Sequence, residues 1–576
     1  MSKTTKLSSA KNLHQLAHIL GYRPRGLAYV VYGRHESEKY EKFEIPKAKG
    51  GYRTISAPKP ELKKLQQHLA KYLYDVVKEN QENSSGRKSL NHAFLPGHSI
   101  FTNAKIHRAR RYVLNIDLEE FFPSINFGRV RGFLLKDNRF QLHEPVATLI
   151  SQIACFENSL PQGAPSSPIL SSLISQPLDV RLAKFAKKNF CHYSRYADDI
   201  TFSTNRKEFP PAIAYEIPSG GGDWVAAPTL VKEIRNCGFE INHYKTRMQF
   251  QERRQDVNGI VVNEKINVRR EYYKQARAMC HSLFANGVYW RLEPNVHGLN
   301  VEKKKYVAYG SNELEPLQGI LNHIYTVRKT GNAQRAKGSQ NTENPEALYS
   351  AFLFFKYFAC PAKPVIITEG KTDPVYLRPA IQKTASVQPV LGEPHSDGFS
   401  YHVKFLSEKA LVNDFYDLGK GTGELAKFIG KYNQRMAKYK YKTLAHPVII
   451  IVDNDKGANP VFSAAKENGA SNVSLKTTES FYKINNNLYL VKVPETDSSG
   501  APRKKGSIES LFPDWVLKEK IGIKTFNPDK EHDAKGEFGK HVFAHEVVRP
   551  KMGEIDFSDF EILLKRVSDV LVDYGS

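Results

Sequence analysis

Three aspartates in the first half of the chain lie where short apolar runs begin or end. Asp117 closes the run YVLNI, and Asp198 and Asp199 stand between Tyr196-Ala197 and the β-type segment ITFS. Carboxylates at neighbouring strand ends can hold two divalent ions about 4 Å apart, the arrangement that nucleotidyl transfer requires. Paired aspartates are also common in turns. We predict that Asp117, Asp198 and Asp199 are catalytic and hold two Mg²⁺ ions.

A second set of acids lies in the last third of the chain. Glu369 and Asp373 follow the run PVIIT, and Asp453 and Asp455 follow PVIIIV. Apolar β runs that end in acids, separated by helical segments, predict a parallel sheet with function at its carboxyl edge. Glu369 and Asp373 are four residues apart, so a helix beginning there would keep both on one side. We predict a Mg²⁺ site of one or two ions, with Glu369, Asp453 and Asp455 catalytic and Asp373 a further ligand.

The elements that must position the first set alternate between strand and helix. The patterns predict a short helix over 13–20, a strand at AYVVYG, and an amphipathic helix over 59–80. Between 112 and 258, short β runs alternate with helical segments, an α+β pattern, and PPAIAYEIPSGGGDWVAAP is predicted to be a surface insertion. The stretch from 269 to about 330 is helical and basic, and TGNAQRAKGSQNTENPEA is the best linker candidate.

Charge separates the two halves. The chain of 576 residues carries a net charge of +24, and residues 1–350 hold 52 Lys and Arg against 32 Asp and Glu, whereas the remainder holds 32 against 28. A surplus of this kind is typical of a protein that binds nucleic acid, although a ribosomal protein or a solvated basic face would also show it. The first half is therefore the predicted polyanion binder.

Cysteine usage and hydropathy bear on the compartment. The five cysteines are scattered with no C-x-x-C pair, which argues against a zinc site or a disulfide framework. No apolar run reaches about 18 residues and the first residues lack an apolar signal core. We expect reduced, mostly buried thiols, no membrane partner and a cytoplasmic, bacterial protein.

The order of motifs resembles that of reverse transcriptases. NIDLEEFF, LPQGAPSSP, YADD and GFEINHYKTRM follow one another as in that family. The resemblance implies a right-hand polymerase of fingers, palm and thumb that uses dNTPs. It assigns Leu118 a backbone carbonyl ligand to the metal and makes Phe122 the aromatic gate against ribonucleotides, with Phe121 as the alternative if the register is shifted by one. It also implies that nucleotide-binding residues are Gln162, Gly163 and, as triphosphate contacts, Arg53 and Lys245.

Two further segments resemble retron reverse transcriptases. Asn103-Ala104-Lys105-Ile106-His107 matches their N-A-x-x-H element, and Val257-Asn258-Gly259 stands where they carry V-T-G, a departure at Asn258. The resemblance implies a cognate noncoding RNA that is copied in part from an internal 2′-OH, giving a branched RNA–DNA hybrid, and trimming by a host RNase H. The predicted RNA-binding residues are Asn103, His107, Val257, Asn258, Gly259, Arg269, Arg270, Tyr272, Tyr273 and Lys274.

The C-terminal acids resemble a Toprim domain, the fold shared by topoisomerases, primases and a class of nucleases. Ser507-Ile508-Glu509 is similar to a further acidic element of one nuclease branch, which adds Glu509 as a metal ligand and Lys504 or Lys505 as a cation beside it. An ordinary helix N-cap would also explain that segment. Little room remains for the tyrosine domain of a topoisomerase, so the resemblance implies a nuclease.

The resulting prediction is an α+β right-hand polymerase followed by an α/β Toprim domain with a mainly parallel sheet. Its parts are an N-terminal and fingers region over 1–110, a palm over 111–262, a thumb over 263–330, a linker over 331–346, and the Toprim nuclease-like domain over 347–576. The leading hypothesis is a retron enzyme of antiviral defence whose nuclease is restrained by the RNA–DNA hybrid, and a homo-oligomer with nucleic acid is one form in which it would act. The alternatives are a group II intron-like or other mobile-element reverse transcriptase, and a non-catalytic RNA scaffold.

Overall fold

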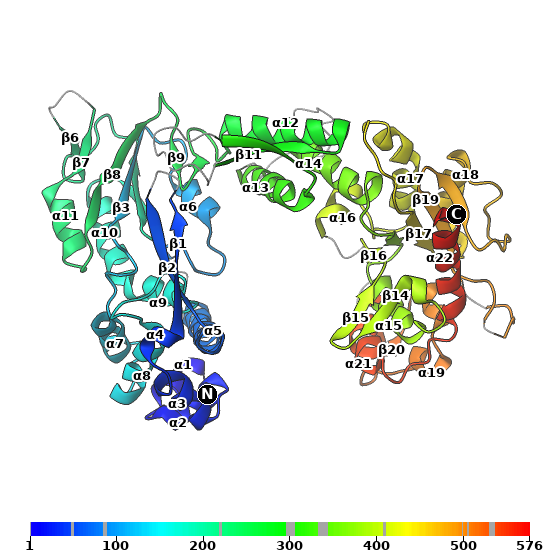
Figure 1. The fold of residues 1–576 in the computed structure, drawn as a ribbon, viewed down its shortest axis with the longest axis horizontal. Coiled ribbons are helices and arrows are strands. Elements are labelled where there is room, and N and C mark those ends of the chain that lie inside the picture. Colours follow the sequence, from blue (N-terminus) through cyan, green and yellow to red (C-terminus); the bar gives the residue numbers. More distant parts are fainter. Residues whose placement is uncertain are drawn as a thin grey trace. The chain divides into compact units, whose positions relative to one another are not determined.

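The chain forms two compact units, which are described separately (Figure 1). The first comprises residues 1–270 and 326–335, and the second comprises 271–325 and 336–576. The structure, a computed structural model, describes residues 2–47, 51–83, 89–217, 222–294, 306–331, 344–406, 410–497, 499–503, 506–528 and 536–575.

The first unit begins with a cluster of helices on one long helix. The helices are α1 (Lys3–Ser8), α2 (Leu13–Leu20), α3 (Pro24–Tyr32), α4 (Glu36–Lys39) and α5 (Pro60–Asn83). The predicted helices over 13–20 and 59–80 are confirmed, but the strand predicted at AYVVYG is wrong because it lies in α3. Pro24 starts this helix, and Leu27 and Val31, four residues apart, are buried on one face, so packing overrides the β propensity of the Tyr and Val residues.

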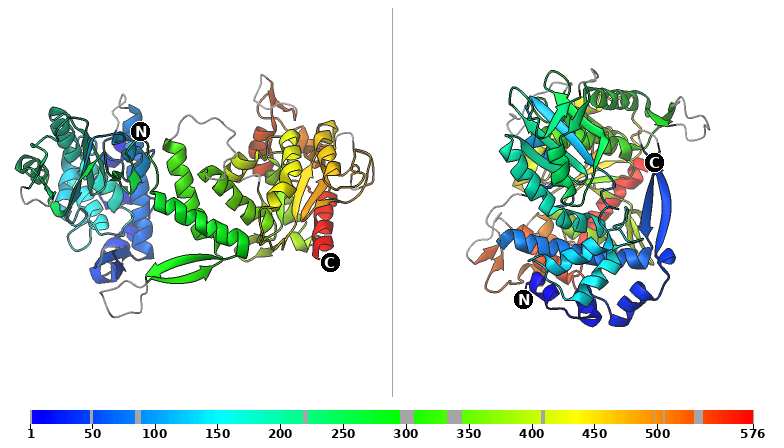
Figure 2. Two further views of the ribbon diagram at one scale, coloured as in Figure 1. Left: turned by 90° about the horizontal axis from the view of Figure 1, so that it is seen from above. Right: turned by 90° about the vertical axis from the view of Figure 1, so that its left-hand side faces the viewer.

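A two-stranded antiparallel ribbon links α4 to α5. It consists of β1 (Tyr40–Pro46) and β2 (Tyr52–Pro58), and its strands can be seen in Figure 2. Toward the turn, the side chains of Phe43, Ile45 and Tyr52 are exposed. The ribbon is therefore anchored at the end near α5, where Tyr40 and Pro58 are buried.

The central sheet of the first unit is antiparallel, in the order β4-β5-β3-β8. Its strands are β3 (Tyr112–Leu118), β4 (His192–Tyr196), β5 (Asp199–Thr204) and β8 (Ile241–Phe250), as predicted from their β-type runs. The helices of this region are α6 (Ile100–Ile106), α7 (Phe127–Lys136), α8 (Glu144–Ala154), α9 (Ser167–Ile174) and α10 (Gln176–Lys188). The central residues of β3 and β5 are almost all buried, which fixes this sheet as the rigid base of the first unit.

The pairing of β8 with β3 is irregular near the first aspartate. Asn115 pairs with Arg247, whereas Asp117 pairs with Asn242, so three extra residues lie on the β8 side. A bulge of this kind re-aims the side chains it carries. It contains Lys245 and the fully exposed Tyr244.

The segment predicted as a surface insertion is part of the packed unit. It forms β6 (Ala214–Glu216) and β7 (Trp224–Ala226), followed by α11 (Pro228–Arg235). Ile213 and Ala214 are fully buried, so the prediction of a mere surface insertion is wrong for these flanks. The many Pro and Gly residues of this segment predict a loop, and its few apolar residues form no periodic pattern that would predict burial.

A tight hairpin follows β8. Its strands are β9 (Asp256–Val257) and β10 (Ile260–Val261), with Val257 paired to Ile260. The two loop residues, Asn258 and Gly259, have φ of 48° and 80°. Both residues of a type I′ turn need positive φ, and Asn-Gly is the sequence that adopts it most readily.

Part of the predicted thumb packs within the second unit. Its elements are α12 (Arg270–Asn286), β11 (Tyr289–Pro294), β12 (Tyr306–Ser311) and α13 (Leu314–Gly331). The Phe284 ring packs against Phe355 and Tyr439, and the backbone N–H of Tyr441 donates to Phe284 O. The β11–β12 hairpin was not predicted, and most of the predicted linker (332–343) lies outside the described residues.

The second unit is built on a five-stranded sheet in the order β16-β13-β17-β19-β18. The strands are β13 (Val365–Thr368), β16 (Lys404–Phe405), β17 (Val448–Val452), β18 (Tyr482–Asn485) and β19 (Leu488–Lys492). All neighbouring pairs are parallel except β18 and β19. The central strands β13 and β17 are buried along their length, which explains their unbroken apolar sequences.

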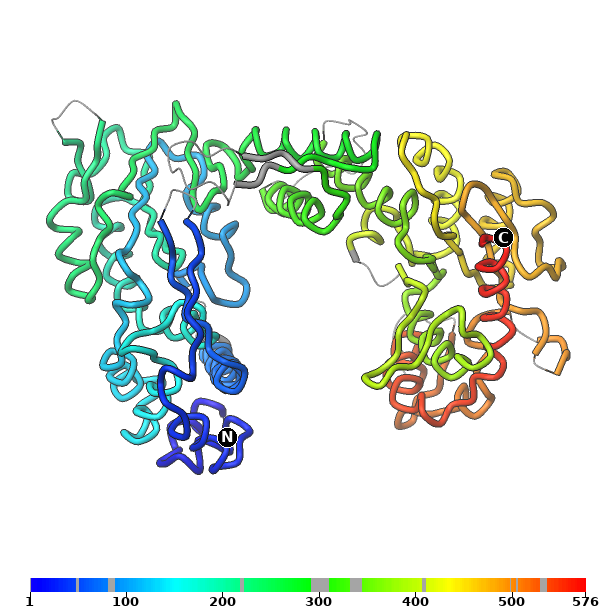
Figure 3. The backbone as a smooth tube through the Cα atoms, in the orientation of Figure 1, coloured from blue at the N-terminus to red at the C-terminus, as the bar shows by residue number. Residues whose placement is uncertain are grey.

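The remaining elements of the second unit can be followed in the tube of Figure 3. The helices are α14 (Pro345–Phe354), η1 (Phe355–Ala359), α15 (Asp373–Lys383), η2 (Pro389–Leu391), α16 (Ala410–Tyr416), α17 (Thr422–Met436), η3 (Lys456–Ala458), α18 (Asn459–Glu467), η4 (Ile508–Leu511), α19 (Asp514–Leu517), α20 (Lys540–Val542), η5 (Phe543–Val548), α21 (Arg549–Lys551) and α22 (Phe560–Gly575). Two small hairpins or pairs complete it: β14 (Gly392–His395) with β15 (Gly398–Tyr401), and β20 (Thr525–Phe526) with β21 (Glu537–Phe538).

The cysteines are less buried than expected, because Cys191 and Cys280 are buried whereas Cys155, Cys237 and Cys360 are only partly buried. All five cysteines are unpaired, and burial raises the pKa of Cys155 and Cys280 to about 12. In the described ranges, no helix combines the length and the apolar character needed to cross a membrane.

Candidate functional site

Adjacent strands bring the three N-terminal aspartates together. Asp117 on β3 pairs directly with Asp199 on β5, and the backbone N–H of Leu118 donates to Asp198 O at 3.0 Å. Asp198 lies in the two-residue turn between β4 and β5, whose other member, Ala197, has a φ of 57°. The juxtaposition predicted from spacing is therefore present in the structure.

A buried ion pair between Arg195 and Asp179 holds this turn in place. The Arg195 guanidinium donates to both carboxylate oxygens of Asp179 on α10, at 2.8 and 2.7 Å, and to Ser175 Oγ at 2.7 Å. It also donates to Ala197 O at 2.7 Å, inside the turn. Since Arg195 is fully buried, these bonds tie the turn to α10, and sequence reasoning did not identify this residue.

Crowded negative charge is the main electrostatic feature of this site. Burial, and then the Asp117 carboxylate, raise the pKa of Asp198, while burial together with Asp198 and Asp117 raises the pKa of Asp199 to about 7. The Lys245 ammonium donates to both Asp117 oxygens, at 2.9 and 3.0 Å. Lys245 lies in the β8 bulge, which places its side chain beside the Asp117 carboxylate.

The donor set fits Mg²⁺. Hard carboxylate oxygens that repel one another in a buried place are relieved by a divalent cation. In the conformation described, no three His, Cys, Asp or Glu side chains of the described ranges are spaced to hold a metal, at this site or elsewhere. Asp117, Asp198 and Asp199 would hold the ions, which supply activation of the attacking hydroxyl and neutralisation of the pyrophosphate.

The predicted nucleotide contacts lie on elements around the carboxylates. Arg53, exposed on β2, is close enough to lower the pKa of Asp198 in part. Phe121 is buried and stacks on Phe239, whereas Phe122 is only partly buried, so of the two aromatics Phe122 is the more accessible. Its role as a gate stays a prediction.

The loop with Gln162 and Gly163 contacts the β1–β2 ribbon. Gln162 O accepts from the Ser56 N–H at 2.8 Å. A Cβ on Gly163, whose φ is 118°, would lie 2.8 Å from Ile55 Cγ2 and 2.9 Å from Ser56 O. Close backbone approach therefore does require this glycine, and the partner in the structure is β2.

The two retron-like motifs meet beside Asp199. Asn103 and His107 on and after α6 are fully buried, as is Val257. Asn103 Nδ2 donates to Asn258 Oδ1 at 2.6 Å, and Asn258 Nδ2 donates to Asp199 Oδ2 at 2.9 Å. In this structure the side chains of Asn103 and His107 are not accessible to RNA, so RNA contact by them is not supported here.

The remaining predicted RNA contacts lie at the start of α12. Arg269, Arg270 and Lys274 are exposed, whereas Tyr272 and Tyr273 are partly buried. Arg269 is also held by Asp256 at 2.9 Å, in a cluster described below. Exposure of the three cations is compatible with phosphate binding, and RNA contact by all five residues stays a prediction.

The C-terminal acids gather at the carboxyl edge of the second unit's sheet. The Asp453 N–H lies 3.4 Å from Glu369 Oε2, and the Gly370 N–H donates to Asp373 Oδ2 at 2.9 Å. The helix expected to carry both Glu369 and Asp373 instead begins at Asp373, because Asp373 accepts from the loop before α15. Asp455 is exposed and accepts from the Gly457 N–H at the start of η3.

Mutual repulsion marks this second cluster as well. Burial and then Glu509 raise the pKa of Asp373 to about 7, and burial with Glu509 and Glu369 raises that of Asp453 well above its ordinary value. Burial also raises the pKa of Glu369. Acids held together in this way are suited to Mg²⁺.

Glu509 is the most unusual member of the cluster. It is 2% exposed on η4, and within the described residues neither carboxylate oxygen has a well-formed hydrogen bond. The Ser507 side chain makes no capping bond, which argues against a simple N-cap. A buried carboxylate with so few hydrogen-bond partners suits a metal ligand, and this role of Glu509 stays a prediction.

The cation beside this cluster is Lys540. Its ammonium lies 3.1 Å from Glu509 Oε1 and 4.0 Å from Asp453 Oδ2. Burial opposes its charge, but Glu509 and Asp453 outweigh burial and raise the pKa of Lys540. The predicted cations Lys504 and Lys505 lie outside the described residues, and no signal in the sequence singled out Lys540.

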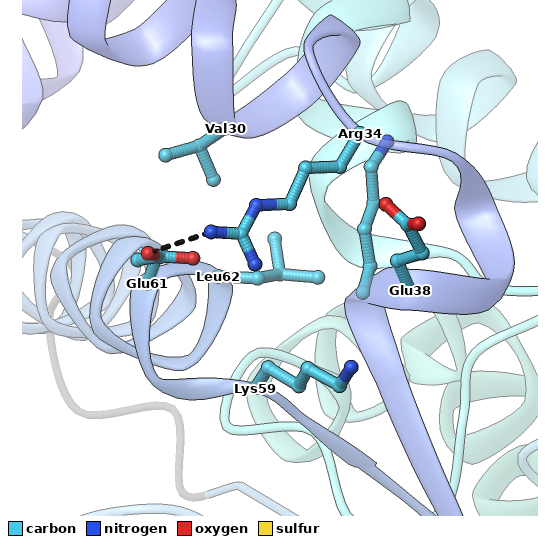
Figure 4. Close-up of a pocket in the computed structure, with 7 residues that line it drawn as sticks. Val30, Arg34, Glu38, Lys59, Glu61 and Leu62 are labelled. Carbon is cyan, nitrogen blue, oxygen red and sulfur yellow. Dashed lines mark hydrogen bonds and ion pairs between the residues drawn. The ribbon is translucent and has the colours of Figure 1, made fainter.

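A small pocket in the first unit is unrelated to these clusters. Figure 4 shows it between α3, α4 and α5, with Arg34 paired to Glu61 at 3.0 Å. Its volume is about 10 Å³. That is the space of about one water molecule, so this pocket does not accommodate a nucleotide.

Comparisons with known proteins agree with the arrangement of the first unit. The family described as reverse transcriptase (RNA-dependent DNA polymerase) matches residues 45–262, which include all three aspartates. The retron Mx162 reverse transcriptase of Myxococcus xanthus is 31% identical over 57% of this chain and 69% of its own length. The retron Ec86 reverse transcriptase of Escherichia coli is 32% identical over 47% of this chain and 78% of its own length.

Solved structures add little to these relatives. The apo telomerase of Candida tropicalis superposes with a TM-score of 0.27 at 13% identity, over 40% of this chain and 55% of that chain, a likeness too weak to support a conclusion. The curated relatives and the intact carboxylates suffice. This chain belongs to the retron reverse transcriptase family and is an RNA-directed DNA polymerase with a reverse transcriptase-like fold.

Proposed function

We propose that the chain binds a structured noncoding RNA and copies part of it from an internal 2′-OH, giving a branched RNA–DNA hybrid (msDNA). The observation that carries this proposal is the intact set of Asp117, Asp198 and Asp199 in a member of the retron family. The excess of basic residues before residue 350 provides the counter-charge for the RNA.

The reaction can be tested by reconstitution. The full chain is incubated with its cognate RNA, labelled dNTPs and Mg²⁺, and the product is digested separately with RNase and DNase. We expect a species that both enzymes shorten and that retains one branched ribonucleotide. Label incorporated only as linear cDNA from a 3′-OH would instead favour a mobile-element enzyme.

The catalytic residues have their own control. Asp198→Asn and Asp199→Asn together are expected to abolish incorporation while RNA binding persists, because the fold and the basic surface remain. Undiminished incorporation by this variant would refute the assignment. Persistent copied RNA in the product, removed on addition of a bacterial RNase H, would support trimming by a host enzyme in the bacterial cytoplasm.

We further propose that the second unit is a Toprim-type, Mg²⁺-dependent nuclease and the effector of an antiviral defence system. Support comes from Glu369, Asp373, Asp453 and Glu509, which crowd one edge of a mainly parallel sheet with Lys540 among them. Hydrolysis of a phosphodiester needs this combination of hard ligands and a neighbouring cation.

This activity is tested in the full-length chain. Asp453→Asn should remove metal-dependent cleavage of DNA or RNA substrates while reverse transcription continues, and the Asp198→Asn, Asp199→Asn variant supplies the reciprocal control. If cleavage survived Asp453→Asn and Glu369→Ala, the nuclease assignment would fail. Greater cleavage or toxicity when the hybrid is removed would support restraint of this unit by the hybrid.

A further inference from the structure

A continuous chain of side-chain hydrogen bonds runs from the buried His107 to the carboxylate of Asp199. His107 Nε2 lies 2.7 Å from Ser194 Oγ, and Ser194 Oγ donates to Asn103 Oδ1. Asn103 Nδ2 then donates to Asn258 Oδ1 at 2.6 Å, and Asn258 Nδ2 donates to Asp199 Oδ2 at 2.9 Å.

The carboxylate at one end of this path determines which group donates in each hydrogen bond. When Asp199 is deprotonated, as metal binding requires, its carboxylate only accepts, so Asn258 presents its amide N–H₂ to Asp199 and its carbonyl to Asn103. Asn103 in turn presents its carbonyl to Ser194, which leaves the Ser194 oxygen to accept from His107 Nε2–H.

The far end of the chain is consistent with this direction. His107 Nδ1 lies 2.7 Å from Ser203 Oγ, which can donate to it when Nε2 carries the proton. Burial lowers the pKa of His107 to about 3, so the imidazole is neutral, with one donor and one acceptor nitrogen. Along this path of hydrogen bonds, each donor therefore faces an acceptor.

The backbone also presents Asn258 to the catalytic strand. It occupies the first loop position of the β9–β10 turn with a φ of 48°, a conformation that asparagine tolerates better than most residues. The paired residues Val257 and Ile260 are buried, so the turn has a fixed anchor. An amide held on a rigid turn restrains the carboxylate it contacts.

Burial decides between a positioning role and an RNA-reading role. Four side chains of this hydrogen-bond path are fully buried, so their polar atoms bond to one another and not to an outside ligand. They are Asn103, His107, Ser194 and Ser203. We propose that Asn258 is a positioning residue for the catalytic carboxylate of Asp199, and that Asn103, Ser194 and His107 hold its amide in the donating orientation. The proposal rests on the polymerase activity and not on formation of a branched product.

The test uses a generic RNA template with an annealed DNA primer and the full-length protein. Asn258→Gly removes the amide but keeps positive φ accessible, so the turn is preserved. Asn103→Asp is nearly isosteric and replaces the donor that faces Asn258 by an acceptor. Each change is expected to lower kcat by about 10- to 100-fold, the effect of losing one hydrogen bond to a charged group.

Three further measurements separate positioning from folding and from RNA binding. The Kd for template–primer and the melting temperature without Mg²⁺ should stay close to wild type. The double variant should be no slower than Asn258→Gly alone, because Asn103 acts through Asn258. Asn263→Ala is the matched control, since within the described residues the Asn263 side chain bonds only to the backbone of Gln255, Gln251 and Arg253, and the kcat of this variant should be unchanged.

Two outcomes would overturn the proposal. One is an unchanged kcat on the generic template with a loss of cognate RNA binding, which would make these residues RNA readers. The other is a lower melting temperature with normal kcat per folded molecule, which would make the chain of bonds purely structural. If Asn103→Asp fails to fold, Asn258→Asp gives the same comparison, because it exchanges the donor to Asp199 for a second carboxylate.

Discussion

The Lys245 ammonium donates hydrogen bonds to both carboxylate oxygens of Asp117, at 2.9 and 3.0 Å. The lysine is carried by the β8 bulge and is about half exposed, while the aspartate is nearly buried. The ammonium therefore occupies the place where a divalent cation would bind, and Mg²⁺ must displace it.

The first prediction concerns this competition. Lys245→Gln should lower the Mg²⁺ concentration that half-saturates catalysis, because the competing cation is gone. The same change should raise the KM for dNTPs, because a cation that is displaced from Asp117 is free to meet the triphosphate. Primer extension over a Mg²⁺ series and a dNTP series measures both. A higher Mg²⁺ requirement would contradict the competition.

The second prediction concerns pH. The pKa of Asp199 rises from 3.8 to about 7, so between these values the folded protein keeps a proton that the unfolded chain has released. The contribution of this group to the free energy of unfolding therefore falls as the pH rises through that window. In metal-free protein, Asp199→Asn should melt higher than wild type at pH 8, with the difference vanishing near pH 4.

The control for this pH dependence is Asp223→Asn, at an exposed aspartate between β6 and β7. It should leave the melting curves unchanged at both pH values. Added Mg²⁺ should raise the melting temperature of wild type at pH 8 more than that of Asp199→Asn. An Asp199→Asn gain that is equal at pH 4 and pH 8 would rule out titration as its cause.

The third prediction concerns Glu509 in the second unit. Its buried carboxylate is paired with the Lys540 ammonium at 3.1 Å and raises the pKa of Asp373 and Asp453. Glu509→Gln should abolish the rise in melting temperature that Mg²⁺ gives this unit, because it removes a carboxylate ligand, and it also removes the ion pair with Lys540. Glu519→Gln, at a partly exposed ion pair with Lys551, should change stability by less than about 0.5 kcal/mol.

The fourth prediction concerns the close approach at Gly163. Gly163→Ala would place a Cβ 2.8 Å from Ile55 Cγ2 and 2.9 Å from Ser56 O, at a φ of 118°. It should push β2 from the loop, lower the melting temperature and raise the KM for dNTPs. Gly132→Ala within α7 meets nothing within 4 Å and should stabilise by about 0.5–1 kcal/mol.

The fifth prediction concerns three arginines around one buried acid. Arg247, Arg254 and Arg269 lie 2.6, 3.7 and 2.9 Å from the carboxylate of Asp256, and all three are about half exposed. Because one acid balances one cation, the cluster retains positive charge for a phosphate backbone. Arg269→Gln should weaken RNA binding and reduce the slope of log K against log salt by about 1.

The matched control is Arg235→Gln, at an exposed arginine paired with Glu240. It should leave the salt slope unchanged, because Glu240 already balances its charge. Equal effects of the two substitutions would show that the Asp256 cluster has no special part in RNA binding.

The sequence by itself determined the elements that carry strong periodic patterns and the acids at their ends. β13 and β17 are nearly unbroken apolar runs, and β3 and β5 are short β-type runs of mostly buried residues, so their positions and the acids at their ends were predictable. The helix α5 was predictable for the same reason, since its long apolar stripe has a helical period.

Local propensity failed where tertiary contacts decide. The β-rich letters of α3 form a helix because Leu27 and Val31 pack on one face, and the Pro- and Gly-rich insertion hides the buried Ile213. These outcomes depend on neighbours that are distant in sequence, so no window of residues contains them.

Only the tertiary structure decided which polar groups serve the sites. Lys540 reaches Glu509 and Arg195 reaches Asp179 across gaps in sequence that no spacing rule covers. Asn258 is a further example. In sequence it is only a departure from the V-T-G motif, whereas in the fold its Nδ2 lies 2.9 Å from Asp199 Oδ2. A hydrogen bond is set by distance and direction in space, and these arise only when the strands and turns have packed.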